Sequence, residues 1–146
     1  MQISRETEYA VRCVAYLAQD PGRTAMIDEI ARDMEIPRSF LAKILQKLAR
    51  ASLVVSFRGA KGGFRLAKPP EEISLYDLFL QTEGPAAARN TCAVSKKRCG
   101  TEGFCAIHPV WESARKDLIE LLRAKRIGDL RRSLRFPMPR FYRTAE

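Results

Sequence analysis

RSFLAKILQKLARASLVVSFRGAKGGFRL, residues 38–66, is the stretch that decides the fold. Its first half repeats apolar residues at the spacing of one buried helix face: Leu41, Ile44, Leu45 and Leu48. Its second half reads as a strand at 53–58, a glycine-containing turn at 59–63 and a returning strand at 64–66. A helix followed directly by a β-hairpin is typical of a recognition helix and its wing. The stretch predicts a winged helix-turn-helix, mainly α with a small β-hairpin.

The polar faces of this helix and hairpin are the candidate DNA contacts. Lysine and arginine neutralise phosphates, hydrogen-bonding side chains read base edges, and glycine at a wing tip permits close backbone approach. The predicted DNA-binding residues are Arg38, Ser39, Phe40, Lys43, Gln46 and Lys47 in the helix and Arg58, Lys61, Gly62 and Arg65 in the hairpin. The alternative is a solvated surface on an ordinary helical bundle.

Two helices are expected before this stretch. Ser4 predicts an N-cap for the first, whose buried stripe includes Cys13, so this cysteine is interpreted as core packing. The second helix has a weakly marked start, for which Thr24 is a candidate cap, and repeats apolar residues at the same spacing: Ile27, Ile30, Ala31 and Met34. A short break at 35–37 then separates it from the recognition helix.

Further helices are expected after the hairpin. Ser74 and Asp77 form a capping box for the next helix, which residues 83–85 end. Pro109 begins a long helix with an apolar stripe of Trp111, Ala114, Leu118, Leu121 and Leu122. Because the winged helix is complete before this helix begins, we expect the stripe at 109–125 to form a homodimer; packing on the chain's own first helix is the alternative.

The segment 91–109, TCAVSKKRCGTEGFCAIHP, contains Cys92, Cys99, Cys105 and the single histidine, His108. Thiolate and imidazole suit zinc or iron–sulfur clusters. The gaps between cysteines exceed those usual between paired zinc ligands, which favours a cluster, and zinc remains the alternative. A disulfide is not expected, because the start of the chain has no signal-peptide pattern and indicates a cytoplasmic protein.

Composition sets further bounds. The 146 residues carry a net charge of +9, which indicates an anionic partner such as nucleic acid. No apolar run is long enough to span a bilayer, so no membrane association is expected. With a single histidine and no phosphate loop, nucleophile elbow or paired catalytic carboxylates, we expect neither an enzyme nor a small-molecule substrate.

Together these patterns divide the chain into four parts. Residues 1–85 are the predicted DNA-binding domain and 86–108 the cysteine-rich loop. Residues 109–134 are the dimerisation helix with a short docking helix, and 135–146 are a basic flexible tail.

With these features the chain resembles the Rrf-two family of bacterial winged-helix transcription regulators, which includes IscR, NsrR and RirA. The resemblance covers residues 1 to about 134. It is carried by Ile3-Ser4, 9–12, 29–31, Leu53-Val54, Arg58-Gly59, 62–69, 83–85, the three-cysteine loop and Trp111.

The resemblance implies that Cys92, Cys99 and Cys105 ligate an iron–sulfur cluster. The fourth ligand varies in the family. Some members use a histidine, which corresponds to His108 here, and others use an acidic residue near the start of the first helix, which corresponds to Glu8. Both remain open, with His108 and a 2Fe–2S cluster favoured over Glu8 and 4Fe–4S.

The implied function is a homodimeric, DNA-binding transcriptional regulator, with a repressor favoured, whose DNA affinity depends on the cluster. It would sense redox state, nitric oxide or iron–sulfur status. The chain departs from the family at Met26, where many members have a capping residue, and at Ala42, where some carry an acid in the recognition helix; the second departure bears on base preference. The alternative is a winged-helix module with structural zinc or no metal.

Overall fold

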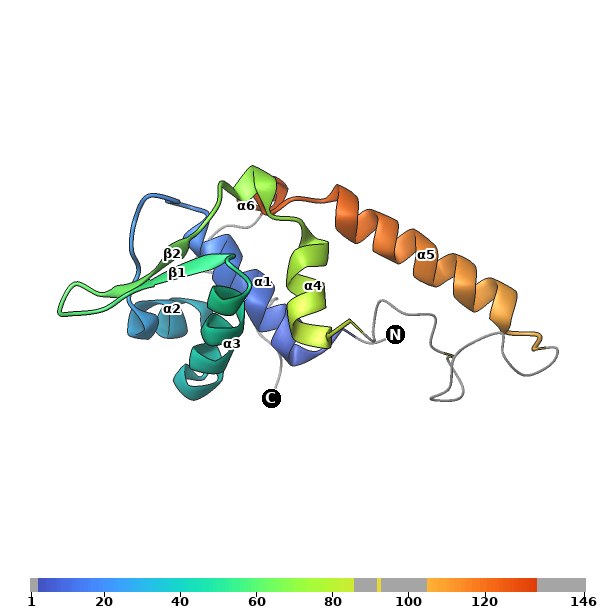
Figure 1. Cartoon of the computed structure of the whole chain (residues 1–146), viewed down its shortest axis with the longest axis horizontal. Coiled ribbons are helices and arrows are strands. Elements are labelled where there is room, and N and C mark those ends of the chain that lie inside the picture. The colour runs from blue at the N-terminus through green and yellow to red at the C-terminus, as the bar shows by residue number, and fades with distance from the viewer. Residues whose placement is uncertain (1–2, 86–91, 93–104, 134–146) are drawn as a thin grey trace.

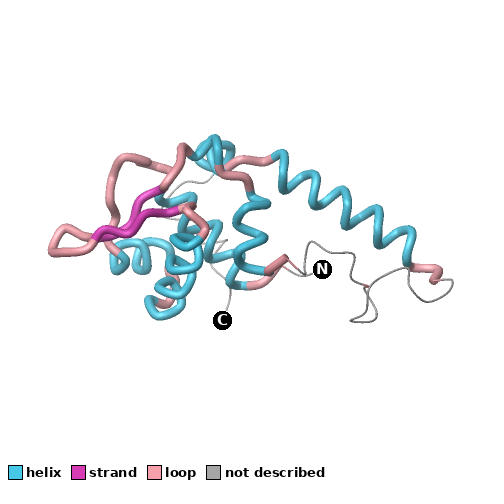
Figure 2. Tube along the Cα trace, viewed as in Figure 1, coloured by secondary structure: helices cyan, strands magenta, loops and turns pink. Residues whose placement is uncertain are grey.

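The computed structural model of the chain describes residues 3–85, 92 and 105–133. The elements run in the order α1 (Arg5–Leu17), α2 (Ile27–Met34), α3 (Arg38–Arg50), β1 (Val54–Phe57), β2 (Gly63–Leu66), the 3-10 turn η1 (Pro70–Glu72), α4 (Leu75–Glu83), α5 (His108–Ala124) and α6 (Ile127–Ser133). Figures 1 and 2 show a helical body from which the two-stranded hairpin and α5 project. The predicted winged helix-turn-helix, mainly α with a hairpin, is confirmed.

Helix α1 lies at the centre of the core and packs against α2, α3, α4 and α6. Its buried face includes Cys13, as predicted from its stripe, and burial raises the pKa of that thiol to about 12. The buried stripe of α3 is the predicted one. Helix α6 completes this core, since Ile127 is 0% exposed within the same cluster.

The helix starts follow the chemistry of their caps. The Ser4 side chain accepts a hydrogen bond from the Thr7 N–H, and Ser74 and Asp77 form the predicted capping box. The candidate cap Thr24 does not cap α2: the N-cap is Met26, whose side chain makes no capping hydrogen bond, in keeping with the weakly marked start. The turn into α3 is sharp because Glu35 adopts a left-handed conformation, φ 54°.

The hairpin is antiparallel, with Val54 opposite Leu66 and Phe57 opposite Gly63. Its second strand also pairs with the segment before α2: the Ala25 N–H donates to the Phe64 carbonyl at 2.9 Å, and the Phe64 N–H donates to the Ala25 carbonyl at 2.8 Å. Strand β2 therefore lies between β1 and Ala25, which ties the base of the wing to the helical body.

Helix α5 extends away from the body in Figure 1 and packs mainly on α4. Of its described side chains, only Leu122 is buried, whereas Val110 is 73% exposed and Leu121 is 54% exposed. The start predicted at Pro109 agrees to within one residue, since α5 begins at His108. Among the residues that the structure describes, no helix is both long and apolar enough to cross a membrane.

Candidate nucleic-acid interface and metal-binding segment

Helix α3 presents a polar face beside its buried stripe. All six of its predicted DNA-binding residues are exposed: Arg38, Ser39, Phe40, Lys43, Gln46 and Lys47. Spacing alone predicts this division, because the remaining face is filled by leucine and isoleucine. The helix therefore offers both cations and hydrogen-bonding groups on one accessible surface.

The cations at the two ends of this face are paired with carboxylates from other helices. Arg38 forms an ion pair with Asp28 of α2, and Lys47 forms one with Glu6 of α1. Lys43, between them, has no ion pair within the described part of the chain. The two carboxylates hold the ends of α3 against α1 and α2. Sequence reasoning missed both pairs, because they join residues on different helices.

Phe40 belongs to the same face and is fixed by an aromatic neighbour. Its ring lies 5.6 Å from the Tyr9 ring, centroid to centroid, at an interplanar angle of 85°. Edge-to-face geometry is one of the two arrangements that aromatic rings prefer. Phe40 nevertheless stays 39% exposed, so an apolar surface is available beside the cations.

On the wing, Arg58, Lys61 and Arg65 are exposed and make no ion pair among the residues described. Gly62 has a role in the tip itself: a Cβ there would lie 2.4 Å from the Phe57 carbonyl oxygen and 2.8 Å from that of Gly59. The predicted approach of Gly62 to DNA stays a prediction, since the fold of the tip already requires glycine.

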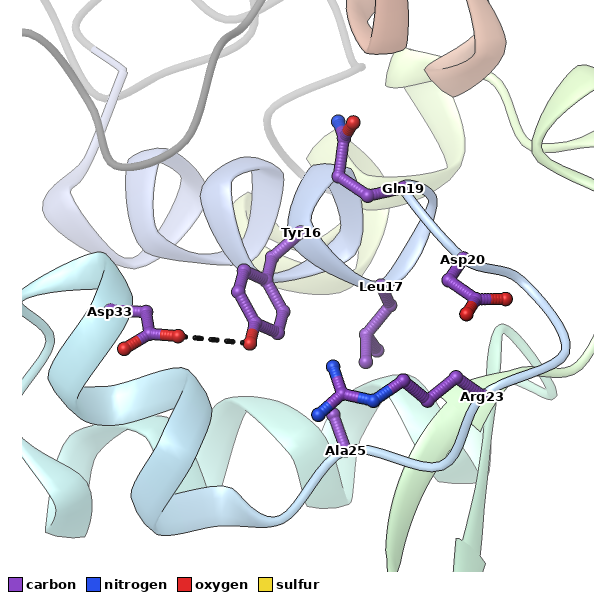
Figure 3. Close-up of a pocket in the computed structure, with 7 residues that line it drawn as sticks. All are labelled: Tyr16, Leu17, Gln19, Asp20, Arg23, Ala25 and Asp33. Atoms are coloured by element: carbon purple, nitrogen blue, oxygen red, sulfur yellow. Dashed lines mark hydrogen bonds between the residues drawn. The ribbon is translucent and has the colours of Figure 1, made fainter.

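A hydrogen-bonded cluster joins α2 to α1, and Figure 3 draws its contact between Tyr16 and Asp33. The Tyr16 hydroxyl oxygen lies 2.7 Å from a carboxylate oxygen of Glu29 and 3.0 Å from one of Asp33, so its single proton can be donated to either, and Arg23 forms an ion pair with Glu29. Burial and the hydrogen bond to Glu29 raise the pKa of Tyr16 to about 12. The hydrogen bond from Tyr16 lowers the pKa of Glu29. The cluster borders a hollow of about 500 Å³ and sets the position of α2, and through it that of α3.

The predicted metal ligands are described only in part. Cys92 and Cys105 are half-buried, whereas Cys99 lies outside the described residues. The His108 N–H donates to the Cys105 carbonyl at 3.2 Å, so these two residues share one turn at the start of α5. Within 3–85, 92 and 105–133, no three histidine, cysteine or acidic side chains gather around a common point.

Both candidates for the fourth ligand have neighbours of their own. His108 Nε2 lies 3.3 Å from a carboxylate oxygen of Glu112, one turn along α5. Glu8 forms an ion pair with Arg12 on α1. Either side chain would have to exchange a contact for a metal, and the ligand set stays a prediction.

Glu83, the last residue of α4, makes hydrogen bonds to the start of α1. The cysteine-rich loop follows shortly after this residue. Glu83 accepts hydrogen bonds from the Ser4 N–H at 2.9 Å and from the Thr7 hydroxyl, which also lies 2.6 Å from the Thr82 hydroxyl oxygen. Burial acts to raise the pKa of Glu83, but the hydrogen bonds from Ser4 and Thr7 outweigh it, so the pKa lies below its usual value. We name this contact between α4 and α1 the Glu83 latch.

Comparison with known proteins gives consistent results. Residues 3–133 match the Rrf2 family model, which is described as an iron-dependent transcriptional regulator. An HTH-type transcriptional regulator of Aquifex aeolicus (strain VF5) is 33% identical over 132 residues, or 89% of this chain and 91% of that protein. Protein aau3 of Rhizobium meliloti (strain 1021) is 35% identical over 130 residues, or 89% of this chain and 84% of that protein.

Solved structures agree with the fold. CymR, the global cysteine regulator of B. subtilis, superimposes with a TM-score of 0.78 at 25% identity over 92% of this chain and 99% of that one. T. potens IscR superimposes with a TM-score of 0.73 at 25% identity over 91% of this chain and 88% of that one.

Proposed function

The chain belongs to the Rrf2 family of DNA-binding transcriptional regulators, not to an enzyme family, and from this premise we propose that it is a homodimeric regulator whose affinity for DNA is set by an iron–sulfur cluster. The single observation that carries the DNA-binding part is the exposed polar face of α3, which is followed directly in the chain by a wing with exposed cations.

In the proposed complex, α3 lies in the major groove and the wing reaches the adjacent minor groove or its phosphates. Lys43, Arg58 and Lys61 make phosphate contacts, and Ser39 and Gln46 read base edges. Two copies of α3 in a dimer then contact half-sites about 10 base pairs apart, or a multiple of that spacing. Phosphate contacts make the affinity fall steeply with salt.

The dimer is proposed to form through α5. Val110 and Leu121 of α5, with Ile107 at its N-cap, are exposed, and only Leu122 of the helix's described side chains is buried. Apolar surface of this kind favours burial against another chain. A monomer in solution at micromolar concentration would contradict this part of the proposal.

The chemistry of the donor set fits a cluster. Cys92, Cys99 and Cys105 supply thiolates, and His108, which shares a turn with Cys105, supplies an imidazole nitrogen. A 2Fe–2S cluster is slightly favoured and 4Fe–4S is the second choice; Glu8 is the second candidate for the fourth ligand. A bound cluster supplies a centre that reacts with oxidants or nitric oxide. The sign of regulation is proposed to be repression.

The chain's own contacts support a connection between the loop and the DNA-binding face. The Glu83 latch fixes the last residue of α4, three residues before the loop, to the start of α1. That same turn carries Glu6, which pairs with Lys47 on the DNA-binding face of α3. A change in how the loop leaves α4 would therefore shift the start of α1 and alter the hold on Lys47.

The experiment is an anaerobic purification with a visible spectrum, metal and sulfide analysis, and DNA binding of the same sample. We expect visible absorption with matching iron and sulfide. Replacement of Cys92, Cys99 or Cys105 by Ala should abolish the absorption and change DNA affinity 5- to 150-fold, as for a coupling of about 1–3 kcal/mol. Cys13→Ala is the matched control and should keep the cluster, because Cys13 is buried in the core.

Zinc without visible absorption would replace the cluster proposal by the structural-metal alternative, in which metal removal unfolds the region instead of tuning DNA affinity. Cysteine variants that retain the cluster, or that lose it with unchanged DNA affinity, would refute control by the cluster. DNA binding itself would still be tested separately by Lys43→Ala.

A further inference from the structure

Phe57, the last residue of β1, is a large aromatic side chain that remains 36% exposed. Its place in the hairpin follows from the register. Val54 and Leu66 form a pair that is buried in the core, and side chains alternate between the two faces of a strand. Val55 and Phe57 of β1, with Arg65 of β2, therefore lie together on the outer face of the wing.

The Arg65 side chain crosses this face toward the tip. Arg65 pairs with Val55, two residue pairs farther from the tip than the pair of Phe57 and Gly63. Its guanidinium carbon nevertheless lies 4.7 Å from the centre of the Phe57 ring. Gly63, opposite Phe57, has no side chain to occupy that space. Arg65 thus leans toward the end of the hairpin that carries Arg58 and Lys61.

An aromatic ring holds a guanidinium without cancelling its charge. A carboxylate would fix Arg65 equally well but would neutralise it, as Asp28 and Glu6 partly do for Arg38 and Lys47 on α3. Stacking occupies the flat face of the guanidinium and leaves its N–H edge available for a phosphate oxygen. The structure thus keeps Arg65 both oriented and charged.

We propose that Phe57 is a positioning residue of the wing, which holds the Arg65 guanidinium toward the tip so that Arg65 makes a DNA phosphate contact. This inference rests on the proposed function, since it requires the wing to bind DNA. Phe57 acts through Arg65 and makes no DNA contact of its own.

The test is a double-mutant cycle of Phe57→Leu and Arg65→Ala. Binding is measured by fluorescence anisotropy with a labelled duplex of mixed sequence and about 30 base pairs, roughly three helical turns, over a series of salt concentrations. Arg65→Ala should lower the affinity about 3- to 10-fold and reduce the salt slope by about 1. Phe57→Leu should give part of that loss alone and no further loss in the Arg65→Ala background. Val55→Ala, on the same face, is the control and should leave the affinity unchanged.

Equal losses from Phe57→Leu in both backgrounds, or no loss in the wild-type background, would overturn the inference. In either case a loss of affinity on Lys43→Ala would show that the proposed DNA-binding surface stands. If Lys43→Ala and Arg65→Ala both bind as wild type does, the proposed function fails as well. Should Phe57→Leu not fold, the Arg65 Hε resonance of the wild type decides: an upfield ring-current shift supports the contact, and an unshifted resonance refutes it.

Discussion

Replacing Gly63 by alanine should detach the wing from the helical body. Gly63 has φ +152°, a conformation that residues with a Cβ rarely adopt. A Cβ at this position would lie 2.3 Å from the Ala25 carbonyl oxygen, far inside contact distance. The backbone must therefore move, and the neighbouring pair of hydrogen bonds between Ala25 and Phe64 is the first contact to break.

The expected cost has two parts. Forcing a residue with a Cβ into a disfavoured backbone conformation costs about 1–3 kcal/mol. Two backbone hydrogen bonds contribute about 0.5–1.5 kcal/mol each. The free energy of unfolding of the Gly63→Ala variant should thus fall by about 2–6 kcal/mol, a large share of the roughly 5–15 kcal/mol of a typical domain. Urea denaturation followed by circular dichroism measures this loss, and DNA affinity under conditions where the variant is folded should fall as well.

Two glycines serve as controls. Gly59 has φ +104° but no atom within 4 Å of an added Cβ, so Gly59→Ala measures backbone strain without the clash. At Gly22 the nearest atom would be 4.0 Å away, and Gly22→Ala should lie within about 0.5 kcal/mol of the wild type. The reasoning is refuted if Gly63→Ala is as stable as the wild type, or if it costs no more than Gly59→Ala.

Three further predictions concern the contacts around the recognition helix. Glu6→Gln removes the exposed ion pair with Lys47, which is worth about 0.2–1 kcal/mol. The affinity for a DNA duplex at low salt should therefore rise about 1.5- to 5-fold. A gain in affinity that is unchanged at high salt would contradict this account. Tyr16→Phe removes the hydroxyl that donates to Glu29 and should lower the free energy of unfolding by about 1–3 kcal/mol at neutral pH in urea titrations; wild-type stability would show that the hydroxyl does not hold α2 on α1. Because the pKa of Glu83 is lower in the folded state than in the unfolded state, its contribution to stability is present above the unfolded pKa and is lost as pH falls through the folded pKa. Thermal unfolding of Glu83→Gln should therefore depend less on pH below about pH 4.5 than that of the wild type, and parallel profiles would exclude the latch as a source of acid sensitivity.

The features that sequence predicted well depend on residues close together in the chain. The buried stripe of α3 repeats at helical spacing, and the capping box of Ser74 and Asp77 spans three residues. The hairpin is likewise marked by its own turn. In each of these patterns both partners of the interaction lie within a few residues of each other, so the contact can be predicted from the local sequence.

The features that sequence missed join residues on separate elements. Nothing local indicates that Glu6 lies beside Lys47, since these residues are far apart in the chain and meet only when α1 packs on α3. The pairing of Ala25 with β2 has the same origin. The start of α2 is weakly marked in the sequence because Met26, its N-cap, offers no capping oxygen, and the backbone pairing of Ala25 with Phe64 just before it cannot be read locally.

The charges of the proposed DNA-binding surface fall into two groups with different consequences. Arg38 and Lys47, at the ends of α3, are each paired with a carboxylate. Each therefore attracts a phosphate less strongly than an unpaired cation would. Lys43 and the wing cations have no such partner within the described residues and should account for most of the salt dependence. Because the carboxylates that hold the ends of α3 come from α1 and α2, small movements of those helices would change both the position of α3 and the effective charge of the surface. The first turn of α1 carries Glu6 and also contacts Glu83 through the Glu83 latch. We therefore expect a signal from the loop to act on DNA affinity through this turn.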